Sequence, residues 1–85
     1  MGTGDMTIRA AVFEVLDNLG KRDISGWNLY DMIEAKTSRH PYPPTLLNYA
    51  RDWASISGGG FDCIDPVHSV YRVTPGVNIS GAIVD

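Results

Sequence analysis

Cys63, Asp65 and His68 are the residues of this 85-residue chain that come nearest to the types and spacing of a metal site. Thiolate and imidazole groups bind zinc, and four residues separate Cys63 from His68. A structural zinc site needs a second pair of such ligands, and the sequence has no matching pair. We therefore predict no metal site, and we interpret Cys63 as a buried strand residue and His68 as a turn residue.

The other arrangements that could support catalysis are also incomplete. Glu14 and Asp17 are two carboxylates on the solvent-facing side of a predicted helix, and nothing in the sequence suggests a pocket around them. The run SGGG at residues 57–60 lacks the Lys-Ser/Thr pair that completes a phosphate-binding loop. We therefore expect no enzymatic activity, no cofactor and no small-molecule ligand, although a subunit of a larger enzyme stays open.

The charge is distributed unevenly along the chain, whose formal net charge is -3. Residues 5–34 hold six acids and three bases, residues 36–51 hold three bases and no acid, and residues 52–85 hold four acids and one base. The only positive segment contains Lys36, Arg39 and Arg51. A local positive charge acts within a Debye length of about 8–10 Å at physiological salt, so this segment is where an anionic partner would bind.

Other features of the composition concern the setting of the protein. The single cysteine excludes an internal disulfide and favours a reducing compartment. No apolar run approaches the roughly 20 residues of a membrane span, and residues 1–10 lack the pattern of a secretory signal. We therefore expect a cytoplasmic protein with no membrane partner.

The first two helices are predicted from apolar residues at helical spacing. Residues 7–19 place a broad stripe on one face, with Asp5 or Thr7 as the N-cap and Gly20 as the stop. The segment from Lys21 then reads as a short linker. A second helix follows from the N-cap Ser25 to about Lys36, with the apolar face Leu29, Met32 and Ile33.

The third helix is predicted for residues 44–56, inside the stretch HPYPPTLLNYARDW. Residues before prolines avoid the helical region, so the chain runs extended until Pro44, which suits the first helical position. Leu46, Tyr49, Ala50 and Trp53 then form one apolar face. The opposite face carries the polar residues Thr45, Asn48, Arg51, Asp52 and Ser55.

The remainder of the chain is predicted as a hairpin and a tail. Glycines 58–60 break the third helix, and residues 61–74 alternate or are rich in β-branched and aromatic types, with PVHS as the loop. The tail, residues 76–85, is either disordered or a strand for a dimer contact. Its apolar residues are Val77, Ile79, Ile83 and Val84.

The order of these elements resembles a winged helix-turn-helix domain. The likeness is carried by IRAAVFEVLDNLG, ISGWNLYDMIEA, YPPTLLNYARDWA and FDCIDPVHSVYRVTP, and it covers residues 7–75. It implies an α+β fold of three helices with a C-terminal two-stranded β-hairpin wing, preceded by a flexible N-terminus at residues 1–6.

The resemblance also implies a function, which is sequence-specific binding of double-stranded DNA by a transcriptional regulator. Helix 44–56 would be the recognition helix in the major groove. Thr45 and Asn48 would contact base edges or phosphates, and Arg51 would reach phosphate or guanine. The predicted phosphate and wing contacts are Lys36, Arg39, His68 and Arg72. The tail would allow a homodimer on paired half-sites.

Two departures from the winged helix pattern favour an alternative function. The third helix has a single basic residue beside Asp52, and the hairpin adds Asp62 and Asp65, whereas DNA-binding domains usually carry more positive charge. The alternative is a protein–protein interaction module on the same scaffold with no direct DNA contact. Trp27 would then be the partner-binding residue, although packing of Trp27 against the linker or tail is the commoner arrangement. A structural subunit that uses the tail as its contact is a third alternative.

Overall fold

The first helix begins and ends at the residues that were expected to cap it. In a computed structural model that describes residues 6–79, α1 spans Ile8–Leu19. Thr7 Oγ1 accepts a hydrogen bond from the Ala10 N–H at 3.2 Å, and Gly20 ends the helix with a φ of 77°. The predicted helix is confirmed. Asp5, the other candidate cap, lies outside the described residues.

The segment between the first two helices is a strand, so its interpretation as a linker was wrong. β1 (Arg22–Ser25) pairs antiparallel with β3 (Val70–Thr74), from Arg22 opposite Val73 to Ser25 opposite Val70. Of its four residues only Ile24 is buried, so β1 shows no alternation of apolar and polar residues. Its hydrogen-bonding partners lie far along the chain, and a local pattern cannot reveal them.

The second and third helices begin close to the predicted positions. α2 (Gly26–Glu34) starts after Ser25, whose Oγ accepts a hydrogen bond from the Asn28 N–H at 3.1 Å. It ends two residues before Lys36. α3 (Pro43–Ser57) starts one residue earlier than predicted, because neither proline needs a backbone N–H in the first turn. Gly58 ends α3 in the left-handed conformation, with a φ of 79°.

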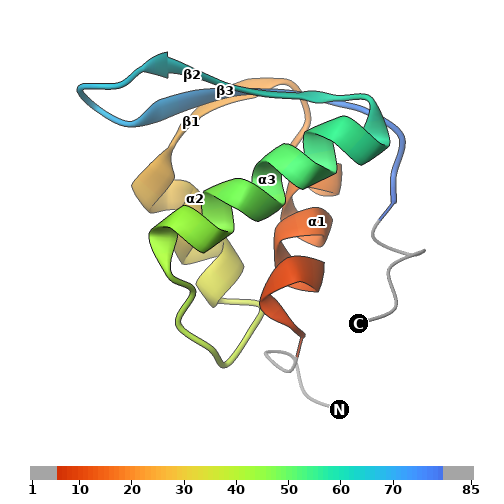
Figure 1. Cartoon of the computed structure of the whole chain (residues 1–85), viewed down its shortest axis with the longest axis vertical. Coiled ribbons are helices and arrows are strands. Elements are labelled where there is room, and N and C mark those ends of the chain that lie inside the picture. Colours follow the sequence, from red (N-terminus) through yellow and green to blue (C-terminus); the bar gives the residue numbers. More distant parts are fainter. Residues whose placement is uncertain (1–5, 80–85) are drawn as a thin grey trace.

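The predicted hairpin is confirmed, but it belongs to a three-stranded sheet rather than a two-stranded one. β2 (Gly60–Asp65) and β3 pair antiparallel, residues 66–69 form the turn, and the strand order is β1-β3-β2. The ladder is irregular between Cys63 and Asp65. In the view of Figure 1, the helices lie on one side of the sheet and the tip of the hairpin reaches past α2.

The core forms where the three helices meet the inner face of the sheet. Trp53 of α3 is fully buried, and its Nε1–H donates to Asp17 Oδ1 of α1 at 2.8 Å. The other core side chains come from every element: Ala11, Val12, Phe13, Val15, Leu16, Ile24, Leu29, Ile33, Leu46, Ala50, Phe61 and Val73. The result is a small α+β domain in which one face of α3 is held against the core. Among residues 6–79, no helix has the length and apolar character needed to cross a membrane.

Cys63 is exposed, so its interpretation as a buried strand residue was wrong. Phe61 is buried in β2, and its ring stacks on Tyr71 with centroids 4.8 Å apart. The three residues after Phe61 are all exposed. β2 is an edge strand that continues toward the hairpin tip, and alternation along such a strand does not ensure burial.

Candidate nucleic-acid interface

The outer face of α3 brings together three of the predicted site residues. Thr45, Asn48 and Arg51 follow one another at intervals of three along the helix. Asn48 and Arg51 are exposed, Thr45 is half-buried, and Arg51 Nη1 donates to Asn48 Oδ1 at 3.5 Å. Because the inner face of α3 is buried, the helix cannot rotate these groups away from solvent. They form a polar face with an amide and a guanidinium, beside the exposed carboxylate of Asp52.

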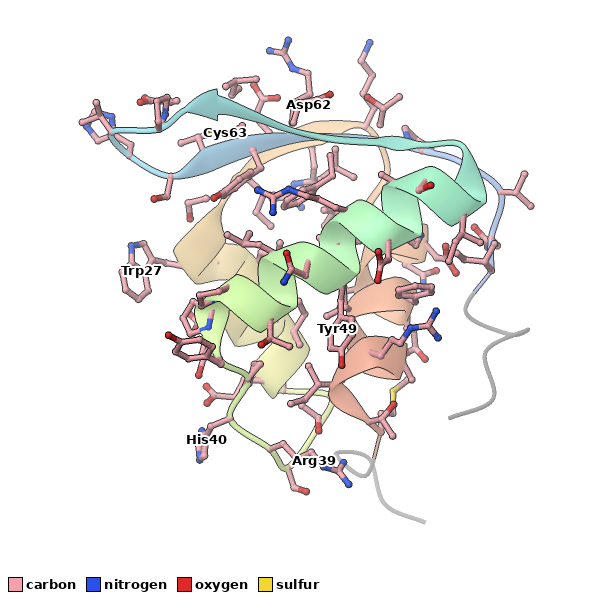
Figure 2. All side chains as sticks on the ribbon, in the orientation of Figure 1. Trp27, Arg39, His40, Tyr49, Asp62 and Cys63 are labelled. Carbon is pink, nitrogen blue, oxygen red and sulfur yellow. The ribbon has the colours of Figure 1, made fainter. Side chains whose placement is uncertain are left out.

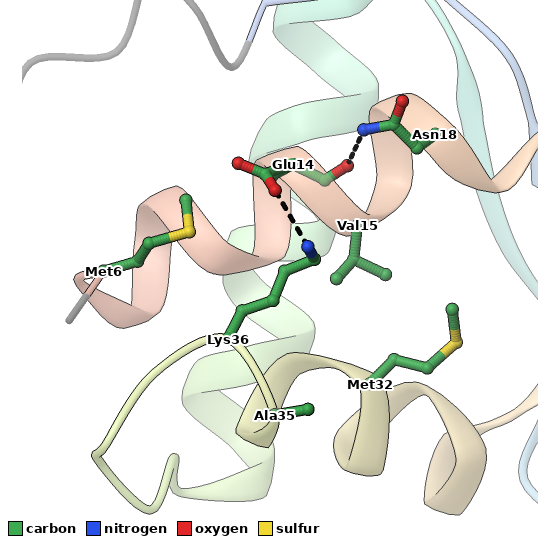
Figure 3. Close-up of a pocket in the computed structure, with 7 residues that line it drawn as sticks. All are labelled: Met6, Glu14, Val15, Asn18, Met32, Ala35 and Lys36. Carbon is green, nitrogen blue, oxygen red and sulfur yellow. Dashed lines mark hydrogen bonds and ion pairs between the residues drawn. The ribbon is translucent and has the colours of Figure 1, made fainter. Parts of the chain in front are cut away.

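Lys36 lies apart from that face, in a hollow between α1 and the end of α2. Its Nζ is 2.8 Å from Glu14 Oε1, and both side chains are about one third exposed, at 39% and 36%. Figure 3 shows this ion pair across the hollow, with α3 behind the two helices. The walls are mainly apolar and include Val15, Met32 and Ala35. The charge of Lys36 is therefore partly neutralised, on a different side of the molecule from the outer face of α3.

Arg39 lies in the loop between α2 and α3, at the end of the molecule away from the sheet (Figure 2). Its Nη1 donates to the Met6 carbonyl at 3.0 Å. Next to it, His40 Nδ1 is 2.6 Å from Glu34 Oε2. A carbonyl does not neutralise a guanidinium, so Arg39 keeps its charge at a position close to the start of α1.

The two predicted wing residues are each paired with a carboxylate. His68, in the hairpin turn, has Nδ1 2.8 Å from Asp65 Oδ2, while Asp65 Oδ1 accepts the N–H groups of Val67 and His68 at 3.2 Å each. The hydrogen bond from the His68 side chain is the main reason that the pKa of Asp65 is lowered. These contacts fix the conformation of the turn. Because they place a carboxylate beside its histidine, the turn has no net positive charge.

Arg72 lies on the outer face of the sheet, against Asp23 of β1. Its Nε and Nη2 donate to the two carboxylate oxygens of Asp23 at 3.0 and 3.4 Å. This hydrogen-bonded pair lowers the pKa of Asp23 and raises the pKa of Arg72. The predicted nucleic-acid-binding residues are therefore not one surface: Thr45, Asn48 and Arg51 lie together, and Lys36, Arg39, His68 and Arg72 lie at four other places.

Sequence reasoning missed two cations, Lys21 and Arg22. Both are exposed, and together with Asp23, Arg72 and Thr74 they line an open hollow at one end of the sheet. Lys21 and Arg22 belong to the net-negative segment 5–34 and were assigned to a linker from the sequence. The two adjacent cations after Gly20 can be seen in the sequence, but only the pairing of β1 with β3 shows that they lie near Arg72.

Trp27 is 75% exposed and points away from α2 in Figure 2, so its expected packing against the linker or tail was wrong. It borders a groove of about 130 Å³ between α2, α3 and β3. The groove is mainly apolar and is also lined by Tyr30, Leu46, Leu47 and Tyr71. Tyr42, at the start of α3, is 70% exposed.

The described residues contain no group of three or more His, Cys, Asp or Glu side chains arranged to hold a metal ion. Comparison of the chain with protein-family models, with curated proteins and with solved structures finds no match.

Proposed function

We propose that this chain is a winged helix domain that binds double-stranded DNA sequence-specifically and acts as a transcriptional regulator, with α3 as its recognition helix. The observation that carries the proposal is the stripe of Thr45, Asn48 and Arg51 on the outer face of α3. The opposite face holds Trp53 and Ala50 at zero exposure, so the stripe is presented in one orientation.

The chemistry of this stripe suits base recognition. Arginine pairs bidentately with guanine O6 and N7, and asparagine pairs with adenine N6 and N7. An α-helix about 10–12 Å wide with its side chains fits the major groove, which is about 12 Å wide. The existing hydrogen bond between Arg51 and Asn48 is long, at 3.5 Å, so both groups are free to turn to bases.

The surrounding elements support the same interpretation. α2 and α3 form a helix pair joined by residues 35–42, and the β2–β3 hairpin follows α3 directly. A hairpin in this position would lie beside the recognition helix and contact the DNA backbone through its turn at residues 66–69. The polar backbone and His68 of that turn are the groups available for such a contact.

The test is fluorescence anisotropy of a labelled random-sequence duplex at low and moderate salt. We expect binding that weakens as salt rises and that Arg51→Ala reduces; on a duplex selected for tight binding, Arg51→Ala should cost about 1–3 kcal/mol, the range for one arginine–guanine pair. Arg9→Ala is the charge-matched control. It also removes one positive charge, but from α1, where the Arg9 guanidinium lies over the Phe13 ring, 4.6 Å from its centroid. Absence of binding at low salt would overturn the proposal.

A second candidate function is a protein–protein interaction module with no direct DNA contact. The specific observation that favours it is the exposed Trp27 beside its apolar groove, since tryptophan anchors are enriched in protein interfaces. The variant Trp27→Ala distinguishes the two functions. If α3 binds DNA, this variant should have the same affinity for DNA as the wild type. If Trp27→Ala abolishes the binding of a partner protein and the wild type binds no duplex, the second function holds.

A further inference from the structure

Lys21, Arg22 and Arg72 meet at one end of the sheet, and we call the hollow that they line the basic hollow. Gly20 turns the chain out of α1, and Lys21 and Arg22 follow it directly at the start of β1. The register places Asp23 opposite Arg72 and Arg22 opposite Val73, so Lys21 and Arg22 become neighbours of Arg72, 51 and 50 residues further along the chain. Asp23 and Thr74 complete the lining.

The charge of the basic hollow is positive although the chain is negative. Its lining holds three cations and one carboxylate, a formal charge of +2. Within residues 6–79, no hydrogen bond or ion pair joins the Lys21 or Arg22 side chain to an acid, in contrast to the pairs formed by Lys36, His68 and Arg72. Asp62 lies across from Arg72 on β2, outside the lining, but its charge also acts on Arg72, so with Asp62 counted the formal charge around the hollow is +1.

Asp23 holds the guanidinium of Arg72 without using all of its donors. The two hydrogen bonds to Asp23 use Nε and Nη2, and a guanidinium has five N–H groups in all. The two donors on Nη1 and the second donor on Nη2 remain for an anion. Arg72 is therefore oriented by Asp23 while it stays about half exposed, at 53%.

We propose that the basic hollow binds the phosphodiester backbone of a DNA duplex, as a second contact surface separate from the outer face of α3. The inference rests on the proposed function and adds a surface to it. An open hollow with three cations suits a backbone that passes across it, because phosphate contacts need donors and positive charge but no enclosure. Such contacts add affinity and carry no sequence information, and only Arg51 on α3 supplies a formal positive charge there.

The hollow lies at the end of the sheet that is away from the hairpin turn. Arg22 pairs near the end of β3, at Val73, whereas the turn begins after Asp65. β3 has five residues and spans about 17 Å, so the turn and the basic hollow lie at the two ends of this strand. The turn and the basic hollow would thus hold phosphates at different places.

The experiment measures how the binding constant for a random-sequence duplex depends on salt, in the full chain and its variants. We expect Lys21→Gln and Arg22→Gln each to reduce the slope of log K against log salt by about 1, and the double variant by about 2. Arg9→Gln removes one positive charge on α1 and should leave the slope unchanged. An unchanged slope in the double variant would overturn the inference.

The outcomes separate this inference from the proposed function. If Arg51→Ala weakens binding while Lys21→Gln and Arg22→Gln do not, the α3 proposal stands and the basic hollow is excluded. If the reverse holds, the hollow binds DNA and α3 is not the recognition helix. If the wild type binds no duplex at low salt, both are overturned. Circular dichroism of each variant confirms that it is folded.

Discussion

Lys36 and Glu14 lie 22 residues apart in the sequence, yet their side chains meet at 2.8 Å. Arg72 and Asp23 are 49 residues apart in the sequence, and their side chains meet at 3.0 Å. The residue types of Lys36 and Arg72 were evident from the sequence, but their partners depend on the packing of α1 on α2 and on the pairing of β1 with β3. Exposed and partly exposed ion pairs contribute little to stability, so each pairing reduces local charge more than it stabilises the fold.

The hairpin turn should make part of the stability depend on pH. The pKa of Asp65 is lowered from its ordinary value of 3.8, chiefly by the His68 side chain and then by the His68 backbone N–H. A group whose pKa is lower in the folded state stabilises the protein above its unfolded pKa, and this contribution is lost as the pH falls through the folded pKa. We therefore expect Asp65→Asn to reduce the loss of stability below about pH 4, as measured by urea unfolding at several pH values.

The direct check is an NMR titration of the Asp65 carboxyl. Its midpoint should lie below 3.8 in the wild type and move upward in His68→Ala. The pKa of Asp23 is lowered chiefly by Arg72 rather than by His68, so its midpoint should not move in His68→Ala, and Asp23 serves as an internal reference. A midpoint for Asp65 that does not move in His68→Ala would contradict the assignment.

The elements that sequence reasoning found are those with a local pattern. α1 and α3 have apolar stripes with a cap or prolines at the start, and glycines at 20 and 58 end them. β1 has one buried residue in four, so no periodicity marks it. The candidate site follows the same division: the polar face of α3 was predictable, whereas the neighbourhood of Lys21 and Arg22 follows only from the pairing of distant strands.

Gly59 and Gly60, which follow α3, differ in the space available for a Cβ atom. We therefore expect alanine to destabilise the protein by different amounts at the two positions. A Cβ at Gly59 would meet the Thr74 carbonyl oxygen and would lie 2.9 Å from the Trp53 ring, whereas a Cβ at Gly60 would lie 3.3 Å from Thr74 Cβ. We expect Gly59→Ala to destabilise the protein by about 1–3 kcal/mol, because backbone and a buried ring must move.

Gly60→Ala is the matched control and should cost less than about 1 kcal/mol, since only a side chain must yield. Urea unfolding of the two variants measures the difference. Equal costs would show that Gly59 does not lie as close to Thr74 and Trp53 as this structure places it.

At the scale of the whole molecule, the segment after β3 packs against the C-terminal parts of α1 and α3. The Val77 N–H donates to the Ser57 carbonyl at 2.9 Å, and the Ile79 N–H donates to Asp17 Oδ2 at 3.0 Å. Ile79 packs against the core, while Val77 is 71% exposed. Residues 75–79 form no strand, and the remaining tail residues, Ile83 and Val84, lie outside the described part of the chain. The homodimer therefore stays a prediction.

These contacts predict that the tail stabilises its own chain. Ile79→Ala should lower the free energy of unfolding by about 1–2 kcal/mol through lost apolar burial, and the exposed control Val77→Ala should change it by less than about 0.5 kcal/mol. The loss should be the same over a tenfold range of protein concentration, because the contact is intramolecular. A loss that shrinks on dilution would instead support the dimer contact, because dilution dissociates the dimer.

The position of β3 in the sheet has a consequence for synthesis of the protein. β3 is the central strand, yet it is the last of the three to be made, and β1 has no partner in the sheet until residues 70–73 are available. Until then a nascent chain on the ribosome carries two unpaired strands and the apolar faces of three helices. We expect this domain to fold in one late step after Thr74 has left the exit tunnel, with chaperones protecting the incomplete chain.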